Sequence, residues 1–164
     1  MKGFTRHGAS ALGLAALVLI LDQISKHWIV EVFELEARGS TPLLGPISLS
    51  MVWNSGVSFG LLGGQTEFTR WALTVFGFGV AAALAVWVRK ADKPLTAAAL
   101  GCIIGGAVGN AIDRIRWGHV ADFIDVSRLY FPWVFNIADA AINIGVGLLI
   151  LELALDSMRR QRPS

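Results

Sequence analysis

Charged side chains are scarce in this sequence. Asp, Glu, Lys and Arg make up 16% of its 164 residues, whereas hydrophobic residues make up 54%, and the mean hydropathy is +0.59. Soluble globular domains carry about 25% charged residues, so this composition argues against a water-soluble globule. The charges also stand at the edges of long apolar runs. The sequence therefore predicts an integral membrane protein, mainly α-helical, with one domain over residues 1–164.

The sequence also has few cysteines and a small net charge. The only cysteine, Cys102, lies inside an apolar run, so an intramolecular disulfide is impossible and the thiol is expected to serve in packing. The net charge is only +2. The basic residues stand beside apolar segments, where they mark membrane orientation. We therefore expect no nucleic-acid partner.

Four apolar segments are long enough to cross a hydrocarbon core, which takes about 20 helical residues. They cover residues 9–30, 68–88, 94–112 and 137–156. The first resembles a signal peptide, but it lacks a cleavage motif of small residues and its helical pattern continues further. We therefore expect it to remain as a span. The two longer connections cover about 31–67 and 113–136.

The positions of lysine and arginine predict the orientation of the spans. Basic residues lie before the first span, between the second and third, and after the fourth: Lys2, Arg6, Arg89, Lys90, Lys93, Arg159, Arg160 and Arg162. We therefore expect both termini in the cytoplasm and both long connections outside. The alternating "ISLSMVW" and the aromatic "SRLYFPWVF" in these connections predict a small extracytoplasmic antiparallel β-sheet, with irregular loop as the alternative.

Three of the predicted spans carry polar residues toward the same outer end. The first span has Asp22, Ser25 and Lys26 on one helical face. The third ends in "GNAIDR" (109–114), and the fourth begins with "FNIADAAIN" (135–143). Ionisable residues in membrane spans are costly and normally face the interior. Their convergence therefore indicates a functional site.

Most of these residues also have a structural explanation. Asp22 and Lys26 stand one turn apart and can neutralise each other. Asp113 and the adjacent Arg114 can clamp the third span to the connection that follows it. Three asparagines can satisfy exposed backbone groups where helices end, which matters in lipid. They are Asn54, Asn110 and Asn136.

Asp122 and Asp139 differ, because neither has an obvious basic partner nearby. Arg116 and Arg128 are each six residues from Asp122, and no Lys or Arg lies within ten residues of Asp139. Two carboxylates held close in apolar surroundings cannot both ionise, so they share one proton. The ionised member can take a proton from water while its partner donates to a carbonyl oxygen. Such a pair favours peptide hydrolysis without a nucleophilic side chain.

Other chemistries stay open on the residues alone. "HVADFID" spaces His119, Asp122 and Asp125 by three residues, a set that can hold a divalent ion. In an extended segment, however, Asp122 would point away from the other two. The three candidate hydroxyls, Ser55, Ser58 and Ser127, lack the elbow motif of serine hydrolases. A proton-coupled transporter would use the same carboxylates as a relay, although the cytoplasmic halves of the first three spans offer almost no polar side chains. An assembly protein would leave the convergence unexplained.

The third span also carries a stripe of small residues. Gly101, Gly105 and Gly109 recur every four residues in "GCIIGGAVG", a spacing that lets another helix approach closely. This contact can be made within one chain, and we expect a monomer.

Five ordered motifs resemble those of the lipoprotein signal peptidases, or signal peptidase II. They are "DQISK" (22–26), "NSGVSFG" (54–60), "GNAIDR" (109–114), "VADF" (120–123) and "FNIADAAI" (135–142). The resemblance covers nearly the whole chain. It implies a metal-independent aspartic endopeptidase of the bacterial inner membrane, with no cofactor. Its substrates would be prolipoproteins, cleaved before a cysteine that carries a diacylglyceryl group.

The resemblance also implies roles for individual residues. Asp122 and Asp139 match the catalytic pair, and Asp22 and Lys26 match a first-span motif with a structural role. Six further residues match positions that line or support the site: Asn54, Gly56, Asn110, Asp113, Arg114 and Asn136. Val57 and Ser58 stand where relatives often have alanine. These are small changes, and we expect the reaction to be the same.

Overall fold

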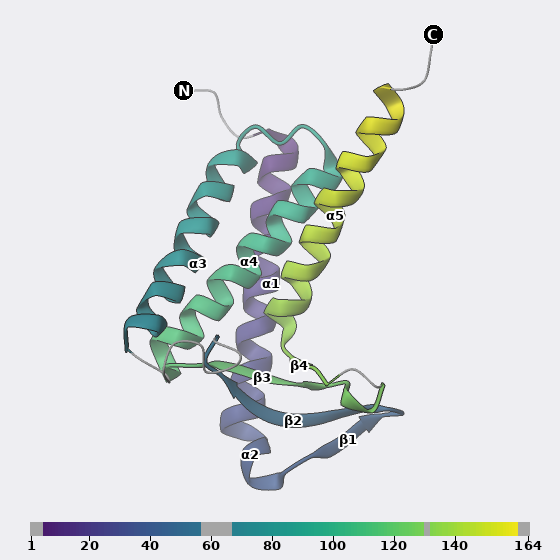
Figure 1. Ribbon diagram of the computed structural model, residues 1–164. Coiled ribbons are helices and arrows are strands. Elements are labelled where there is room, and N and C mark those ends of the chain that lie inside the picture. The colour runs from purple at the N-terminus through teal and green to yellow at the C-terminus, as the bar shows by residue number, and fades with distance from the viewer. Residues whose placement is uncertain (1–4, 57–66, 130–131, 161–164) are drawn as a thin grey trace.

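The computed structural model describes residues 5–56, 67–129 and 132–160. Within these ranges, four long helices form a bundle and a small sheet lies across one end of it (Figure 1). The long helices are α1 (Arg6–His27), α3 (Glu67–Val88), α4 (Pro94–Trp117) and α5 (Ile137–Arg160). A π-helical turn, Trp28–Val32, extends α1, and the short α2 covers Leu35–Arg38. The mainly helical fold class with a small sheet is confirmed.

All four predicted spans are confirmed as helices long and apolar enough to cross a membrane. The predicted end of the third span at residue 112 is wrong, because α4 continues to Trp117. Gly118 then ends the helix with φ +82°, a left-handed conformation that favours glycine. Asp113 and Arg114 therefore belong to the helix and not to the following connection.

The most buried of the long helices is α4, and it lies against α1, α3 and α5. Its glycine stripe faces α1 inside the same chain. A Cβ atom on Gly101 or Gly105 would stand 2.6 Å from the carbonyl oxygen of Ala11 or Ala15, respectively. The prediction of a close helix contact at this stripe is thus confirmed.

This contact predicts that Gly105→Ala destabilises the protein. The new methyl group would stand 2.6 Å from the Ala15 carbonyl oxygen and 2.8 Å from the Val18 Cβ, so α1 and α4 must separate, at a cost of about 1–3 kcal/mol in the free energy of unfolding. Gly13→Ala is the matched control, because no heavy atom lies within 4 Å of its new Cβ. Thermal unfolding in detergent should show a lower midpoint for Gly105→Ala alone. Equal midpoints would contradict the close packing.

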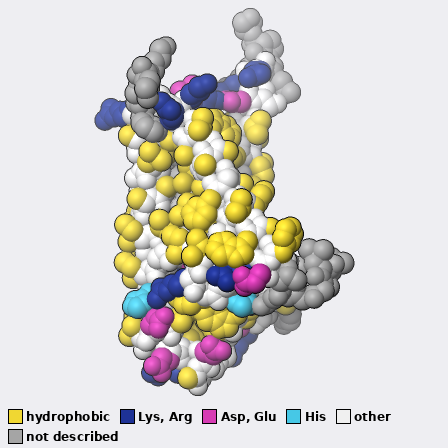
Figure 2. Space-filling view, turned by 90° about the vertical axis from the view of Figure 1, so that its left-hand side faces the viewer, with side chains coloured by type: hydrophobic (Ala, Val, Ile, Leu, Met, Phe, Trp, Pro, Cys, Tyr) yellow, Lys and Arg dark blue, Asp and Glu magenta, His cyan; other side chains and the backbone are white. Residues whose placement is uncertain are grey.

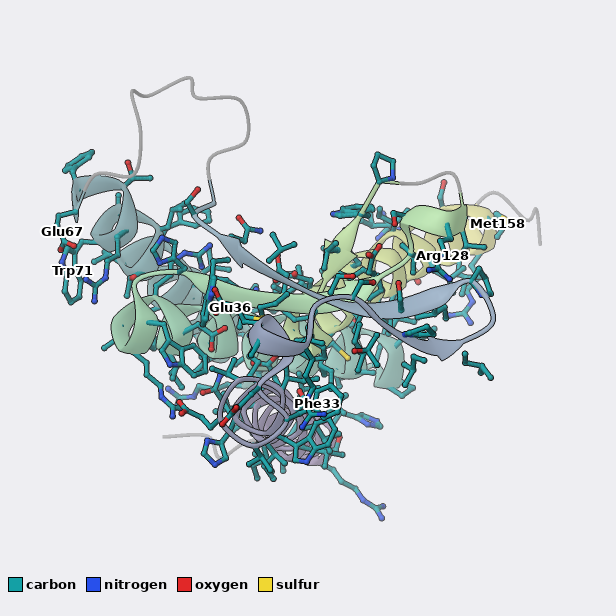
Figure 3. The ribbon with its side chains drawn as sticks, turned by 90° about the horizontal axis from the view of Figure 1, so that it is seen from below. Phe33, Glu36, Glu67, Trp71, Arg128 and Met158 are labelled. Atoms are coloured by element: carbon teal, nitrogen blue, oxygen red, sulfur yellow. The ribbon has the colours of Figure 1, made fainter. Side chains whose placement is uncertain are left out.

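The sheet contains four antiparallel strands in the order β1-β2-β3-β4. They are β1 (Thr41–Leu44), β2 (Ile47–Asn54), β3 (Val120–Asp125) and β4 (Val134–Phe135). The sheet is therefore built from both long connections, and β2 and β3 form its centre. Seen from the sheet end, Glu36 of α2 lies beside these strands (Figure 3), where its carboxylate accepts a hydrogen bond of 3.2 Å from Trp53 Nε1.

The aromatic segment 127–135 contributes less strand than its composition predicts. In the described part of this segment only Val134–Phe135 pairs with β3, whereas Ser127–Leu129 forms a 3-10 turn. The Asp125 carboxylate accepts a hydrogen bond of 2.8 Å from the Ser127 N–H. This local bond competes with strand pairing. Hydrogen bonds from the Ser127 side chain and then from its backbone N–H lower the pKa of Asp125.

Both described chain ends lie at the end of the bundle opposite the sheet (Figure 1). On the face in Figure 2, a broad apolar band separates two groups of charged side chains: basic ones with a few acidic ones at that end, and acidic, histidine and basic ones near the sheet. At the end opposite the sheet, Lys93 joins α4 to α5 by contacting Glu152 (3.1 Å) and Asp156.

Candidate active site

The two predicted catalytic aspartates meet where the sheet covers the bundle. Asp122 is on β3 and is only 2% exposed. Asp139 is in the first turn of α5 and is half-buried. It lines a cavity of about 500 Å³ together with Asn54 of β2 and the aromatic side chains of Trp133 and Phe135. Asp139 therefore faces a space that can hold a peptide and water.

Asn136 links the two aspartates through the start of α5. Its Oδ1 accepts a hydrogen bond of 2.8 Å from the backbone N–H of Asp139, which caps the helix. A backbone N–H can only donate, so the amide nitrogen of Asn136 must point the other way. It donates to Asp122 Oδ1 at 2.6 Å. The cap of α5 thus also orients a donor toward the first carboxylate.

Asn54 supplies the second donor to Asp122, and its amide is likewise oriented by a backbone N–H. Its Oδ1 accepts a hydrogen bond of 2.7 Å from the backbone N–H of Gly56, and its Nδ2 donates to Asp122 Oδ2 at 2.9 Å. Gly56 has φ +80°, and a Cβ atom there would collide with Leu73 Cδ1, so this turn requires glycine. The predicted departure from the family at Val57 and Ser58 lies outside the described residues.

Asn110 donates a hydrogen bond to Asp139, and its amide is also oriented by a partner at its other end. Its Oδ1 accepts a hydrogen bond of 3.0 Å from Lys26 Nζ, and its Nδ2 donates to Asp139 Oδ1 at 2.7 Å. A lysine ammonium has no acceptor, so it fixes the orientation of the Asn110 amide. All three predicted asparagines therefore direct their amide nitrogens toward the two carboxylates.

Lys26 is the centre of a fully buried ionic cluster. Its Nζ lies 2.9 Å from Asp22 and 2.7 Å from Asp113, and all three side chains are 0% exposed. Asp22 Oδ1 also accepts the backbone N–H of Ala138 (2.9 Å), and Asp113 Oδ2 accepts that of Ala121 (3.3 Å). The cluster therefore ties α1 and α4 to the residues next to Asp122 and Asp139.

This cluster confirms one structural prediction and corrects another. Asp22 and Lys26 do pair along α1, as their spacing predicts. The predicted clamp of α4 to the following connection is present through Asp113, which accepts the backbone N–H of Ala121, but within the described ranges the cation paired with Asp113 is Lys26 and not Arg114. Neighbouring residues of a helix point in different directions, and the partner comes from a distant helix.

Gln23 is a site residue that sequence reasoning missed. Its Nε2 lies 2.9 Å from Asp113 Oδ1 and 3.1 Å from Asp22 Oδ2. It also lies 3.3 Å from the carbonyl oxygen of Gly109. The side chain is uncharged, so it does not stand out in the sequence, although its i,i+3 spacing places it near Lys26. Its position inside the matched "DQISK" motif is the only signal in the sequence.

Arg114 lies one helical turn after Asn110 on α4. Its Nη1 donates to the Asn110 carbonyl oxygen at 3.2 Å, and its Nη2 lies next to Gly56. Its Nε is buried and has no hydrogen-bond partner among the described residues. It also lines a second cavity, between α3, α4 and α5.

The surroundings of Asp122 favour its protonated form. Burial, followed by the nearby negative charge of Asp139, raises the pKa of Asp122 to about 7, although the hydrogen bonds from Asn54 and Asn136 act in the opposite direction. Ordinary aspartates titrate near 4. The pair can therefore hold one proton and one negative charge near neutral pH, which is the state that water activation requires.

Among the described residues, those that line the cavity beside Asp139 do not include His119 or Asp125. The His119 ring contacts the Trp53 ring edge-to-face with centroids 6.4 Å apart, and Asp125 closes the turn after β3. Within the described ranges, no three His, Cys, Asp or Glu side chains converge as a metal site.

The sequence of this chain is similar to those of signal peptidases. The family model for signal peptidase (SPase) II matches residues 14–155. The lipoprotein signal peptidase of Caulobacter vibrioides is 56% identical over 90% of this chain and 88% of its own length. That of Beijerinckia indica is 47% identical over 85% of each chain.

Two solved structures share the fold. Both are described as bacterial membrane enzymes solved by the in meso method. One has a TM-score of 0.80 at 26% identity and covers 99% of this chain and 97% of its own, and the other has a TM-score of 0.77 at 28% identity, with 93% and 96% covered. From its sequence, its four-helix fold and its pair of aspartates, this chain belongs to the signal peptidase II family.

Proposed function

We propose that this protein, a lipoprotein signal peptidase, removes the signal peptide of diacylglyceryl-modified prolipoproteins and cleaves before the lipidated cysteine. It is an aspartic endopeptidase by family, and Asp122 and Asp139 are proposed as its catalytic pair. The observation that carries the assignment is the network in which Asn54, Asn110 and Asn136 orient both carboxylates beside one cavity.

The chemistry follows from the shared proton. The ionised carboxylate takes a proton from water, and the hydroxide adds to the scissile carbonyl carbon while the protonated carboxyl donates to the carbonyl oxygen. The tetrahedral intermediate then collapses, and the amine of the lipidated cysteine leaves with a proton returned by the pair. Asn110 and Asn136 hold the carboxylates in place during these steps, because both amides are fixed at their other end. The mechanism requires neither a metal nor a cofactor.

The membrane position proposed for this reaction is the outer face of the inner membrane. Basic residues outnumber acidic ones at the end opposite the sheet, and this excess supports a cytoplasmic location for both termini. The catalytic pair then lies near the outer interface, where a lipid-anchored substrate can keep its acyl chains in the bilayer. We further propose that residues 1–164 act as one domain and as a monomer, since the glycine stripe of α4 is used within the chain.

The direct test is cleavage of a diacylglyceryl-modified precursor by the purified protein in detergent. The lipidated precursor should be cut before its cysteine, the unlipidated precursor should not be cut, and chelators should have no effect. Loss of activity on chelation would favour a metallopeptidase. Solute flux in reconstituted vesicles without any peptidase activity would favour a transporter.

The pKa of Asp122 predicts how activity depends on pH. Because this pKa is raised to about 7, the shared proton is present below neutral pH and is lost as the pH rises through about 7, and cleavage should decline over that interval. Asn54→Ala removes a hydrogen bond that stabilises the ionised form, so the alkaline limb of kcat/KM should move to higher pH. A limb that moves to lower pH would contradict this origin of the pKa.

A further inference from the structure

Asn143 is an isolated polar side chain in the apolar part of α5. Between Asp139 and Glu152 it is the only residue of this helix with a polar side chain. It is exposed, and within the described ranges its amide makes no hydrogen bond to another residue. An amide without a partner is costly in apolar surroundings. The position of Asn143 therefore indicates a partner beyond the described residues.

Asn143 also lines the cavity that Asp139 faces. This cavity of about 500 Å³ is bounded at the sheet by Asn54, Trp133 and Phe135. Asp139 and Asn143 are four residues apart on α5, so their side chains lie on one face of the helix, about 6 Å apart along its axis. Because α5 runs from the sheet toward the opposite end of the bundle (Figure 1), Asn143 lies one turn further from the sheet than Asp139.

The part of the substrate that would reach Asn143 is the signal peptide. A signal peptide has its basic end in the cytoplasm and its apolar segment in the membrane, so it approaches the outer interface from the membrane side. Where its helix ends near the cleavage site, the last four carbonyl groups have no partner within the helix. In hydrocarbon these groups need donors from elsewhere. The Asn143 amide offers two N–H donors, and its oxygen can accept from a backbone N–H.

The spacing along α5 indicates which carbonyl group is in reach. With the scissile carbonyl beside Asp139, Asn143 stands about 6 Å further into the membrane. A peptide bond that is hydrolysed has to leave its helix, and an extended chain advances about 3.3 Å per residue. The distance thus corresponds to about two residues. The carbonyl group opposite Asn143 therefore belongs to the third residue before the lipidated cysteine.

We propose that Asn143 binds the backbone of the signal peptide, and that its Nδ2 donates to the carbonyl oxygen of the third residue before the cysteine. This inference rests on the proposed function. It gives one face of α5 two roles: Asp139 acts on the scissile bond, and Asn143 holds the preceding segment one turn deeper. The contact is made to the backbone and not to a side chain, so it is compatible with precursors of different sequence.

The first test compares Asn143→Leu, which removes the amide at similar size, with Asn143→Gln, which retains it. Asn143→Leu should lower kcat/KM for a lipidated precursor about tenfold, as expected for one hydrogen bond, and Asn143→Gln should lose less. The thermal unfolding midpoint of Asn143→Leu in detergent should equal that of wild type or exceed it, because an unpaired polar group has been removed from apolar surroundings. A lower midpoint with unchanged kinetics would show a structural role and overturn the proposal.

Ile150→Ala is the matched control for a change on the same helix. Ile150 lies two turns beyond Asn143, is 63% exposed and does not line the cavity. Its kcat/KM should therefore match wild type. An equal loss of kcat/KM in Ile150→Ala and Asn143→Leu would show a general effect of altering α5, and would overturn the assignment.

A second measurement identifies the carbonyl group that Asn143 contacts. A precursor is made with an ester in place of the peptide bond between the third and second residues before the cysteine, which weakens that carbonyl oxygen as an acceptor. Wild type should cleave it several-fold more slowly than the all-amide precursor, whereas in Asn143→Leu the ester should have little further effect. Losses that simply multiply would overturn the contact. If wild type cleaves no lipidated precursor, the proposed function itself fails. If wild type cleaves and Asn143→Leu cleaves equally well, only the role of Asn143 fails.

Discussion

Asp139→Asn is expected to lower the cleavage rate of a lipidated precursor by about 10³-fold, since an amide can neither share the proton nor take one from water. The substitution retains the size of the side chain and its acceptor for Asn110 Nδ2, so the fold should persist. Comparing kcat with the thermal unfolding midpoint separates a chemical defect from unfolding. Full activity in Asp139→Asn would disprove the catalytic pair.

Substitution of Asp139 separates the loss of chemistry from distortion of the site better than substitution of Asp122, because the two carboxylates receive different hydrogen bonds. Both oxygens of Asp122 accept from amide nitrogens, one from Asn136 and one from Asn54. Asp122→Asn would place an NH₂ group against one of these donors, and the loss of activity would then combine chemistry with distortion. Asp125→Asn on the same strand is the matched control. Its Oδ1 can still accept from Ser127, and activity should be unchanged.

Lys26→Met is expected to reduce the free energy of unfolding by about 3–5 kcal/mol, because it leaves two buried carboxylates without their cation. The new side chain is similar in length, so the effect reports the missing charge more than a cavity. Lys93→Met is the control at the other end of the bundle. Lys93 also bridges two carboxylates, but it is partly exposed to water, so its removal should cost less. Thermal or denaturant unfolding in detergent compares the two, and equal losses would contradict the special role of the buried cluster.

The sequence predicted the elements of the fold better than their pairing. Runs of apolar residues located all four long helices, since length and hydropathy are local properties. Asp113 shows the limit of such reasoning. The adjacent residue in the sequence, Arg114, was expected to pair with it, but the ion pair is with Lys26 of another helix. The identity of a partner depends on which helix faces meet, and that is decided by packing along the whole bundle.

The proximity of Asp122 and Asp139 could be predicted because neither has a structural partner nearby in the sequence. Asp122 and Asp139 stand in apolar segments without a nearby cation, and the family motifs include both. The directions of the amides were not predictable in the same way. Asn110 is oriented by a lysine from α1, and Asn54 is oriented by the turn at Gly56. Gln23 was missed because nothing in its own surroundings indicates that it would reach Asp113 on another helix.

The buried cluster has a consequence for biosynthesis. Asp22 Oδ1 accepts the backbone N–H of Ala138, a residue 116 positions later in the chain, and Asn136 and Asp139 emerge from the ribosome at the same late stage. Domains begin to fold while the chain is still being synthesised, but here the first helix must wait for the last one before its polar groups are fully satisfied. A nascent chain that lacks α5 has neither the second aspartate nor the cap that orients the first. With Asp122 and Asp139 as the proposed catalytic pair, we expect no peptide cleavage until the insertion of the chain is nearly finished.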